Sequence, residues 1–468
     1  MNRKTRILVT LGPATDSPEQ IGRLVDAGTD VFRLNMTHAA PDWVRRVVRE
    51  IRAATAARRT FAGIVMDLQG PSIRTGDLPE PIELSPGQRF AFTVRGGLAP
   101  DLPSVGVNYP GFIKDVSVGD RVLIDGGVLQ LRILEKQTDW IVCEVLAGGT
   151  LGSRRHINLP GVTVRLPALT EKDLADVRLG LETGVDYLSL SFVREAQNLR
   201  DLRAAMGDMA QRPLVIAKIE DHQAVRNLEA ILREADAVMI ARGDLGIEVP
   251  YEDLPLLQRQ VVEQCLRLGR PVIVATQMLE SMIQSPVPTR AEVTDVANAV
   301  FEQADAVMLS GETSVGRYPL ACVAVLDRVA RRMEASRTEG FQTQAELTSP
   351  RQKLVKSAVV LAEELSAEAI LVFTRTGSMA RHVAGLRPRG SQILALCDSE
   401  RTAAALTLSW GVQPLVVPLN HANPEQSIEG ALKLLVAERR LRSGQTVVII
   451  SSMTSGEQAV DAVQMRML

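Results

Sequence analysis

Eight short apolar runs recur along the chain, and segments with helical periodicity separate most of them. Alternating strand-length runs and helices predict parallel βαβ units, and eight such units close into a (β/α)8 TIM barrel. The functional sites of such barrels lie at the carboxyl ends of the strands. The predicted strands cover residues 7–11, 30–35, 63–68, 187–192, 214–220, 237–242, 271–277 and 306–310.

The segment between the third and fourth runs is rich in turns and lacks a long helical pattern, which predicts an inserted β domain. Its strands are expected at 90–94, 121–124, 129–134 and 140–146. A further α/β unit follows the barrel, with strands expected at 369–374, 392–396, 414–417 and 446–451. Several domains are also expected because 468 residues exceed the roughly 250–300 that one core supports. The predicted ranges are 1–70 and 167–340 for the barrel, 71–166 for the inserted domain and 341–468 for the carboxyl-terminal domain.

The composition excludes several classes of protein. A net charge of −2 gives no attraction toward nucleic acid or an anionic membrane, and no apolar run approaches the ~18 residues of a membrane span. The amino-terminal apolar stretch is broken at once by Gly12-Pro13, so no signal peptide is expected. Four widely spaced cysteines suit a reducing compartment. We therefore expect a cytoplasmic protein.

The fifth run, residues 214–220, ends in two opposite charges. Side chains alternate across a strand, so Lys218 and Glu220 share one face, above Leu214 and Ile216. We expect that face to be the barrel interior. A lysine and a carboxylate at the end of a buried strand suit an anionic substrate held through a divalent ion. A structural ion pair would give the same pattern.

Other predicted strands also end in polar residues. The number of charged side chains expected at this mouth of the barrel exceeds what solvation of the surface requires. These residues are Arg33, Asn35, Asp67, Ser191, Asp244, Thr276 and the run 310–313.

Several roles follow from these residue types. Glu220 and Asp244, from adjacent strands, are suited to bind one Mg²⁺ or Mn²⁺. The backbone N–H of Gly243 is placed to receive a substrate carboxylate, although a tight turn explains that glycine equally well. Arg33 is suited to hold a phosphoryl group in a fork of hydrogen bonds, and Lys218 to stabilise its charge during transfer. Thr276 is the weakest candidate, since a hydroxyl at a strand end is often a helix cap.

At this point the sequence resembles the pyruvate kinase family over essentially its full length. The motifs that carry the resemblance are Leu11-Gly-Pro-Ala, Phe32-Arg-Leu-Asn-Met-Thr-His38, Asp67-Leu-Gln-Gly-Pro-Ser-Ile-Arg74, Ile216-Ala-Lys-Ile-Glu-Asp221, Ala241-Arg-Gly-Asp-Leu-Gly-Ile-Glu248, Ala275-Thr-Gln-Met-Leu-Glu-Ser281 and Met308-Leu-Ser-Gly-Glu-Thr313.

The resemblance implies a TIM barrel, an inserted β-barrel lid domain and a carboxyl-terminal regulatory α/β domain, in a homotetramer that transfers phosphate from phosphoenolpyruvate to ADP in the last step of glycolysis. It implies that Glu220 and Asp244 hold the metal and that Arg33 and Lys218 contact the phosphoryl group. Thr276 is implied in protonating the enolate. The nucleotide side is implied to be lined by Asn35, His38, Arg74 and Arg155.

Two departures from the family concern the lid. The usual Asp-Asp-Gly is Asp125-Gly126-Gly127, so one carboxylate is missing, and the usual Lys-Gly is Arg155-His156.

Two other functions stay open at this point. One is a metal-dependent carbon–carbon lyase acting on pyruvate-like enolates, and the other is a non-enzymatic effector sensor. The lid arginine and Lys218 favour the kinase, and the intact set of site residues disfavours the sensor.

An allosteric site is expected in the third domain. The run Thr374-Arg-Thr-Gly-Ser378 joins a strand to a helix and offers hydroxyls and N–H groups to a phosphate. Similar loops in the family bind sugar phosphates, although an ordinary capped turn has the same sequence. The chain lacks the aromatic and basic loop of members activated by fructose bisphosphate, so we expect a different phosphorylated effector.

Potassium, which many members require, is a separate question. The matching ligands are Asn35, Thr37, Asp67 and the backbone carbonyl of Leu68, where a threonine hydroxyl is usual. Potassium-requiring members carry glutamate at position 72, and members that dispense with K⁺ carry lysine there. Ser72 supplies neither charge, so we expect substantial activity without potassium.

Overall fold

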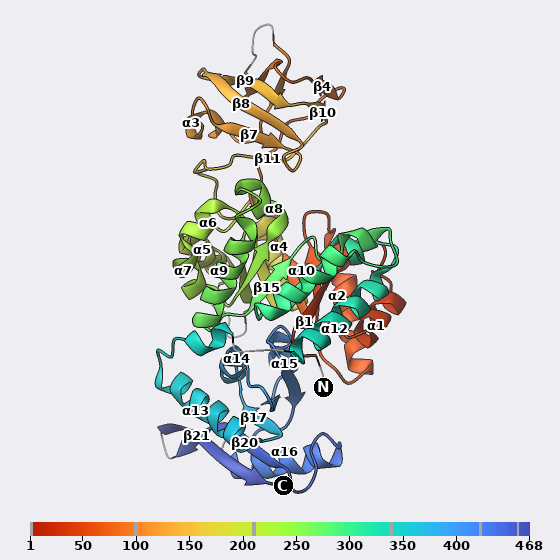
Figure 1. Ribbon diagram of the computed structural model, residues 1–468, viewed down its shortest axis with the longest axis vertical. Coiled ribbons are helices and arrows are strands. Elements are labelled where there is room, and N and C mark those ends of the chain that lie inside the picture. The colour runs from red at the N-terminus through yellow and green to blue at the C-terminus, as the bar shows by residue number, and fades with distance from the viewer. Residues whose placement is uncertain (1–2, 98–101, 208–211, 337–339, 421–423, 456–457) are drawn as a thin grey trace.

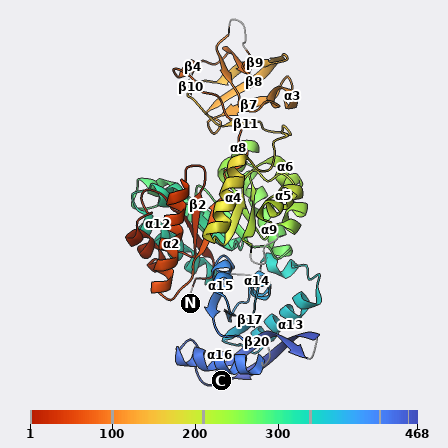
Figure 2. The same ribbon diagram turned by 180° about the vertical axis from the view of Figure 1, so that it is seen from behind.

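The computed structural model describes residues 3–97, 102–207, 212–336, 340–420, 424–455 and 458–468. Three parts follow one another along its long axis (Figure 1), and the view from behind shows the same order (Figure 2). The inserted β domain lies at one end, the barrel in the middle and the carboxyl-terminal domain at the other end. The expected three-part α/β architecture is therefore confirmed.

The barrel contains eight parallel strands in the closed order β1-β16-β15-β14-β13-β12-β3-β2. The strands are β1 (Arg6–Thr10), β2 (Val31–Asn35), β3 (Gly63–Asp67), β12 (Tyr187–Leu190), β13 (Leu214–Ile219), β14 (Ala237–Ala241), β15 (Val272–Ala275) and β16 (Ala306–Leu309). The longer helices around them are α1 (Pro18–Asp26), α2 (Pro41–Ala57), α4 (Glu171–Thr183), α5 (Ala196–Met206), α7 (Leu228–Glu234), α9 (Leu254–Arg267), α10 (Arg290–Phe301) and α12 (Pro319–Glu334). Shorter ones are α6 (His222–Arg226), α8 (Arg242–Glu248), α11 (Gly311–Ser314) and the 3-10 turn η1 (Glu280–Ile283).

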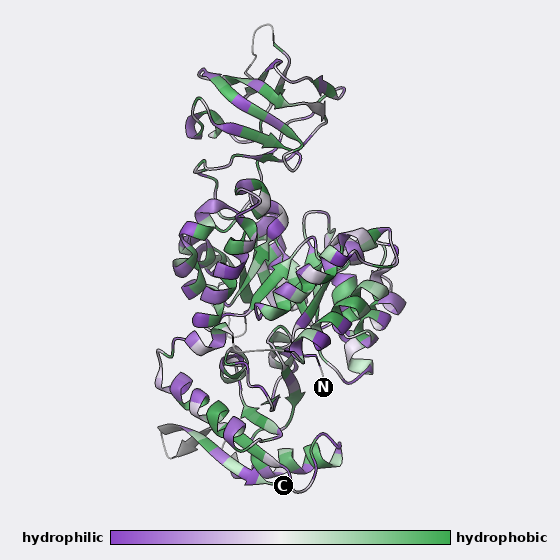
Figure 3. Ribbon diagram, viewed as in Figure 1, coloured by the Kyte–Doolittle hydropathy of each residue, from purple (hydrophilic) through white to green (hydrophobic). Residues whose placement is uncertain are grey.

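The strands are hydrophobic and the helices around them are mixed (Figure 3). The strands are buried on both faces, as expected for a parallel sheet covered by helices. On β13, Val215, Ala217 and Ile219 pack toward the helices, whereas Ile216 joins the apolar cluster of the barrel interior. The period of two then places Lys218 on the interior face, as predicted.

The inserted domain has its own core and two sheets, of order β11-β7-β8-β9-β5-β6 and β10-β4. Its elements are β4 (Ile82–Leu84), β5 (Arg89–Thr93), β6 (Ser104–Gly106), α3 (Phe112–Asp115), β7 (Arg121–Ile124), β8 (Leu129–Lys136), β9 (Trp140–Ala147), β10 (Gly149–Leu151) and β11 (Ile157–Asn158). The four predicted strands are present. The prediction missed the short strands and α3, which are too brief to give a periodic signal.

The carboxyl-terminal domain is a five-stranded sheet of order β19-β18-β17-β20-β21. Its elements are η2 (Phe341–Gln344), α13 (Pro350–Glu364), β17 (Ala369–Phe373), α14 (Ser378–Gly385), β18 (Gln392–Cys397), α15 (Glu400–Leu406), β19 (Val412–Val416), α16 (Pro424–Ala437), β20 (Thr446–Ser455) and β21 (Gln458–Met467). The four predicted strands are present, and antiparallel β21 was missed. The predicted domain boundaries fall in segments that connect these elements, and they stay predictions.

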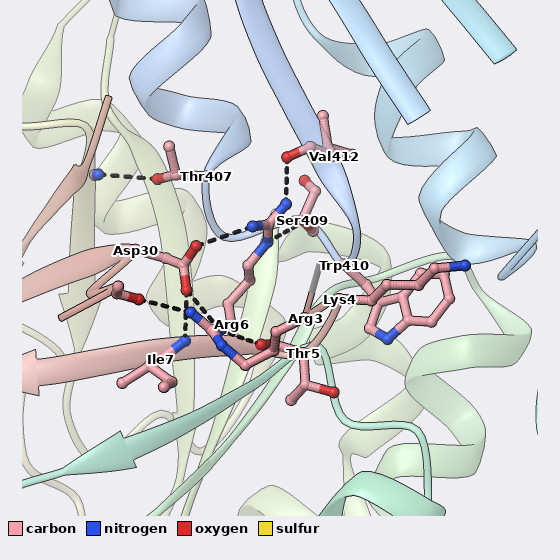
Figure 4. Close-up of polar contacts among 12 residues, drawn as sticks. Arg3, Lys4, Thr5, Arg6, Ile7, Asp30, Thr407, Ser409, Trp410 and Val412 are labelled. Atoms are coloured by element: carbon pink, nitrogen blue, oxygen red, sulfur yellow. Dashed lines mark hydrogen bonds and ion pairs between the residues drawn. The ribbon is translucent and has the colours of Figure 1, made fainter. Parts of the chain in front are cut away.

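The carboxyl-terminal domain closes the amino-terminal end of the barrel through polar contacts (Figure 4). Arg6 donates hydrogen bonds to the carbonyls of Ser409, at 2.9 Å, and Val412. Arg6 also pairs with Asp30 at 2.9 Å, and Asp30 pairs with Arg3 at 2.8 Å. These contacts fix the end of the barrel that lies opposite the strands' carboxyl ends. Among the described residues, no helix is both long and apolar enough to cross a membrane.

A second, deeper ion pair at this junction should be important for stability. Arg387 is fully buried and donates to both carboxylate oxygens of Asp305, at 3.0 and 2.7 Å. Arg387→Met leaves Asp305 buried without its partner, so the free energy of unfolding should fall by about 3–5 kcal/mol in urea titrations. Arg58→Met, which breaks an exposed pair with Asp26, is the control and should change little. Equal losses in the two variants would contradict this role.

Candidate active site

A cleft opens at the carboxyl ends of β2, β3, β12 and β13, at the barrel end that faces the inserted domain. Most of the predicted site residues line it together. Its walls are Arg33, Asn35, Thr37, Asp67, Leu68, Gln69, Ser72, Arg74, His156, Ser191, Phe192, Lys218, Glu220 and Asp244. The sequence prediction of a charged mouth is therefore matched by one continuous cleft.

Lys218 is the centre of this cleft. Its Nζ lies 2.7 Å from Glu220 Oε1 and 3.6 Å from Asp67 Oδ1, and it donates to Ser191 Oγ at 2.7 Å. Burial alone would lower the pKa of Lys218, but the charges of Asp67 and Glu220 outweigh burial and raise it above its ordinary value. The ammonium is therefore fully charged at neutral pH and held in one place.

Arg33 reaches the cleft from β2 and is held by Asp67. Its Nε and Nη2 lie 2.7 and 2.6 Å from Asp67 Oδ2, and its Nη1 donates to Thr10 Oγ1 at 3.1 Å. Burial tends to raise the pKa of Asp67, but Lys218 and Arg33 lower it overall. Asp67 is thus an ionised carboxylate that orients two cations toward the same space.

Glu220 and Asp244 form the acidic part of the cleft. Glu220 Oε2 accepts a hydrogen bond from Phe192 N at 2.6 Å, and Asp244 lies in the first turn of α8. Burial raises the pKa of Glu220 to about 7; Lys218 opposes this rise, and the like charge of Asp244 adds to it. Two carboxylates that repel each other fit a divalent cation. The pair suits Mg²⁺, which is usually bound through one or two carboxylates while substrate oxygens and water complete its coordination.

Thr276 and Gly243 lie beside Asp244, outside the cleft lining. The Gly243 N–H donates to Thr276 Oγ1 at 2.8 Å, and Thr276 Oγ1 donates to the Ala275 carbonyl at 2.6 Å. Thr276 has φ 67° and Gln277 has φ 55°. A β-branched residue at positive φ is rare and costs of order 1–3 kcal/mol. The surrounding contacts must therefore hold this turn.

Arg242, which the sequence analysis missed, is the residue that holds the turn. It donates to the Ala275 and Thr276 carbonyls at 3.3 and 2.6 Å, and it pairs with Asp295 at 2.7 Å. Its signal in the sequence was its place between a buried strand and Gly243, within a motif that the prediction had already singled out. Arg242 thereby fixes the position of the Thr276 hydroxyl.

The residues predicted for the nucleotide side are only partly brought together. Asn35 and Arg74 line the cleft, whereas His38 is exposed outside it. Arg155 is exposed on the inserted domain, where it lies 3.4 Å from Asp125. The neighbouring His156 lines the cleft instead. Burial lowers the pKa of His156, so it is neutral at physiological pH.

The four predicted potassium ligands all line the cleft. Asp67 Oδ1 is buried and has no hydrogen-bond partner, which fits a cation ligand. Asn35 Oδ1 accepts from Thr37 N at 3.2 Å, and the Leu68 carbonyl accepts from Ser191 Oγ at 2.8 Å. The Leu68 side chain itself is buried in the apolar core, so only its carbonyl is directed to polar partners.

Several cleft residues were not assigned a role from the sequence, and three of them make contacts that matter for the site. Ser191 was noted only as a polar strand end, yet it bridges Lys218 and the Leu68 carbonyl. Phe192 adopts φ 54° and directs its N–H to Glu220. His156 enters from the inserted domain. Of these three residues, only Ser191 had a sequence signal for its role, because it is a polar residue at the end of a predicted barrel strand.

Comparisons with known proteins agree with one another. The profile described as "Pyruvate kinase, barrel domain" matches residues 2–323, and "Pyruvate kinase, alpha/beta domain" matches residues 352–464. Plastidial pyruvate kinase 3 of Arabidopsis thaliana is 41% identical over 96% of this chain and 79% of its own. The pyruvate kinase of Geobacillus stearothermophilus is 38% identical over 98% of this chain and 79% of its own. A crystal structure of a Cryptosporidium parvum pyruvate kinase superposes with TM-score 0.92 at 35% identity, covering 99% of this chain and 96% of that one.

Proposed function

The chain belongs to the pyruvate kinase family, and from this premise we propose that it transfers the phosphoryl group of phosphoenolpyruvate to ADP, giving pyruvate and ATP. Membership makes it a phosphotransferase. The observation that carries the proposal is the position of Lys218 and Arg33, two oriented cations above the acidic pair of Glu220 and Asp244. That arrangement suits a phosphoryl group on one side and a metal-bound carboxylate on the other.

The two cations act on the phosphoryl group. Arg33 offers a fork of N–H donors, and Lys218 provides a point charge that is already in place before transfer begins. Their fixed geometry avoids reorganisation when charge moves in the transition state. Glu220 and Asp244 would hold Mg²⁺ or Mn²⁺. When bound, the ion neutralises charge on the substrate oxygens.

Protonation of the enolate involves the other side of the site in this proposal. The Gly243 N–H would receive the substrate carboxylate, which replaces the Thr276 hydroxyl as its acceptor. The freed hydroxyl is then available on the proton path to the enolate carbon. Because Arg242 holds the strained turn, Thr276 needs no further rearrangement to reach that position.

The nucleotide would bind between the barrel and the inserted domain, contacting Asn35, His38, Arg74 and Arg155. In the present arrangement Arg155 pairs with Asp125 at a long 3.4 Å and is exposed, so little energy opposes its movement toward a phosphate. Closure of the inserted domain as a lid would exclude water that competes with ADP.

The cellular setting is also a proposal. All four cysteines are free and buried, which supports a reducing, cytoplasmic location. Met465 and Met467 are exposed on β21, an edge strand, which supports the homotetramer. The loop of residues 374–378 retains its exposed Arg375 and Thr376, which supports a phosphorylated allosteric effector there.

The proposed reaction is tested by a coupled assay for pyruvate formed from phosphoenolpyruvate and ADP. Lys218→Met should lower turnover about 10³-fold or more, because it removes the ammonium that stabilises transferred charge. Lys433→Met, an exposed lysine of the carboxyl-terminal domain, is the matched control. Near-normal turnover in a folded Lys218→Met protein, or no pyruvate from the parent, would contradict the proposal.

The metal site is tested by Mn²⁺ titration in the presence of phosphoenolpyruvate, with free ion measured by electron paramagnetic resonance. Glu220→Gln and Asp244→Asn should each weaken binding about tenfold or more, since each removes a charged oxygen ligand. Glu252→Gln, an exposed carboxylate after α8, should have no effect. Titration curves of the two site variants that overlay the parent's would place the metal elsewhere.

The potassium requirement should be weak. Arg74 Nε lies 3.1 Å from Ser72 Oγ, so a positive charge already stands near position 72. We expect KCl to stimulate turnover by less than about tenfold, equivalent to ~1.4 kcal/mol, at saturating substrates and constant ionic strength. Ser72→Lys should remove the stimulation and Ser72→Glu should enlarge it. Near-zero turnover without potassium would contradict this expectation.

A further inference from the structure

The chain crosses between the barrel and the inserted domain twice, and both crossings rest on the loop between β12 and α5, residues 191–195. The outgoing crossing touches this loop at Gly70. An added Cβ at Gly70 would lie 2.9 Å from Ser191 Cβ and 3.1 Å from Phe192 Cδ2, so a side chain there would have to displace the loop. Gly70 also has φ 70°, and its N–H donates to Asp173 Oδ1 at 3.1 Å. The outgoing chain is therefore fixed against the loop.

Arg194 holds the returning crossing. Its Nη1 donates to the Val164 carbonyl at 2.7 Å, and its Nη2 donates to the Leu166 carbonyl. Between these two carbonyls, the N–H of Arg165 donates to the Tyr109 hydroxyl of the inserted domain at 3.1 Å. The barrel thus holds this segment by its carbonyls, and the inserted domain holds it by an N–H group.

The position of Arg194 is itself set by the barrel. Its backbone N–H donates to Asn198 Oδ1 at 2.9 Å, and its carbonyl accepts from Asn227 Nδ2 at 2.8 Å. Arg194 is buried, with 6% of its surface exposed. A buried guanidinium is stable only when its donors have acceptors, and the two carbonyls of the returning crossing supply them. The returning chain is therefore tied to a fixed point on the barrel.

The same loop orients two charges of the candidate active site. Ser191 Oγ accepts a hydrogen bond from Lys218 Nζ at 2.7 Å, and the Phe192 N–H donates to Glu220 at 2.6 Å. Phe192 has φ 54°, which is uncommon for a residue other than glycine, so its neighbours must hold it there. Arg194 lies two residues further on. A displacement of the returning crossing is therefore passed to the loop that orients Lys218 and Glu220.

The crossings also border a space that leaves them room to move. A cavity of about 60 Å³, enough for a few water molecules, lies between them and the barrel. Val164 and Leu166 line it from the returning crossing, and Phe192 and Arg194 line it from the loop. Because close packing resists displacement, a segment beside a cavity moves more easily than one that is packed on all sides.

We propose that Arg194 is a positioning residue that sets the orientation of the inserted domain and couples it to Lys218 and Glu220. Its effect on turnover rests on the proposed reaction, in which the closed inserted domain excludes water. When this anchor is weakened, water replaces ADP as the acceptor. The bond from phosphorus to the enol oxygen breaks and a bond to the water oxygen forms. The proton that water loses is balanced by the one that the enolate carbon takes up, giving inorganic phosphate and pyruvate.

The first test measures the orientation of the inserted domain without substrates. Spin labels are attached to Val128→Cys, exposed on the inserted domain, and Arg49→Cys, exposed on α2, since all four native cysteines are buried. Labelled chain is diluted with unlabelled chain, so that distances within one chain dominate the pulsed electron paramagnetic resonance signal. Arg194→Met should broaden or shift the distance distribution. The matched control is Arg165→Met, an exposed arginine 3.9 Å from Asp115, which should leave the distribution unchanged.

The second test measures the products formed from phosphoenolpyruvate and ADP. Arg194→Met should raise the ratio of inorganic phosphate to ATP about tenfold or more, because water gains access to the phosphoryl group. A loss of folded protein lowers both products together and leaves their ratio unchanged, so the ratio separates positioning from a purely structural role. Arg194→Lys keeps the charge but cannot hold two carbonyls in one fork, so it should give an intermediate ratio.

The two tests fail in different ways. If Arg194→Met keeps the parent's distance distribution, or if it gives the same product ratio as Arg165→Met, the proposal is wrong. If Arg194→Met does not fold, Arg194→Lys is compared with the parent by the same two measurements, and parental values in either one overturn the proposal. A parent protein that forms no ATP would contradict the proposed reaction, and the distance measurement would still decide whether Arg194 is the anchor.

Discussion

The placement of Lys218 between two buried carboxylates is the constraint on which the site depends. Three charges at the end of β13 and β3 are stable only together, because each would be costly to bury alone. The whole inserted domain separates β3 from β13 in the sequence. Closure of the barrel brings the three charges together, because β3 and β13 both pair with β12. The same closure sets Arg33 against Asp67. Fold and charge arrangement therefore require each other.

The opposite ends of the barrel use charge differently. At the carboxyl ends of the strands, ionic partners are arranged around an open cleft, and their donors are available to a substrate. At the amino-terminal ends, Arg6, Asp30, Arg387 and Asp305 form ion pairs and hydrogen bonds at the junction with the carboxyl-terminal domain.

Much of this arrangement was predictable from local pattern. Period-two alternation placed Lys218 on the interior face, and repetition of apolar runs predicted all eight barrel strands. What escaped prediction depends on contacts between distant segments. The bond from Ser191 to Lys218 and the hold of Arg242 on Thr276 join different strands. His156 lines the cleft in place of the predicted Arg155, and this depends on the position of the inserted domain. β21 was missed because its apolar and polar residues do not alternate regularly along the whole strand.

The central claim is that the barrel mouth assembles one site in which cations face a phosphoryl group and carboxylates face a metal. A crystal structure with Mn²⁺ and phosphoenolpyruvate, using anomalous scattering to locate the metal, tests this most directly. The account predicts an anomalous peak coordinated by Glu220 and Asp244, with the phosphoryl group in contact with Arg33 and Lys218. A metal bound away from this pair, or a phosphoryl group that contacts neither cation, would contradict it.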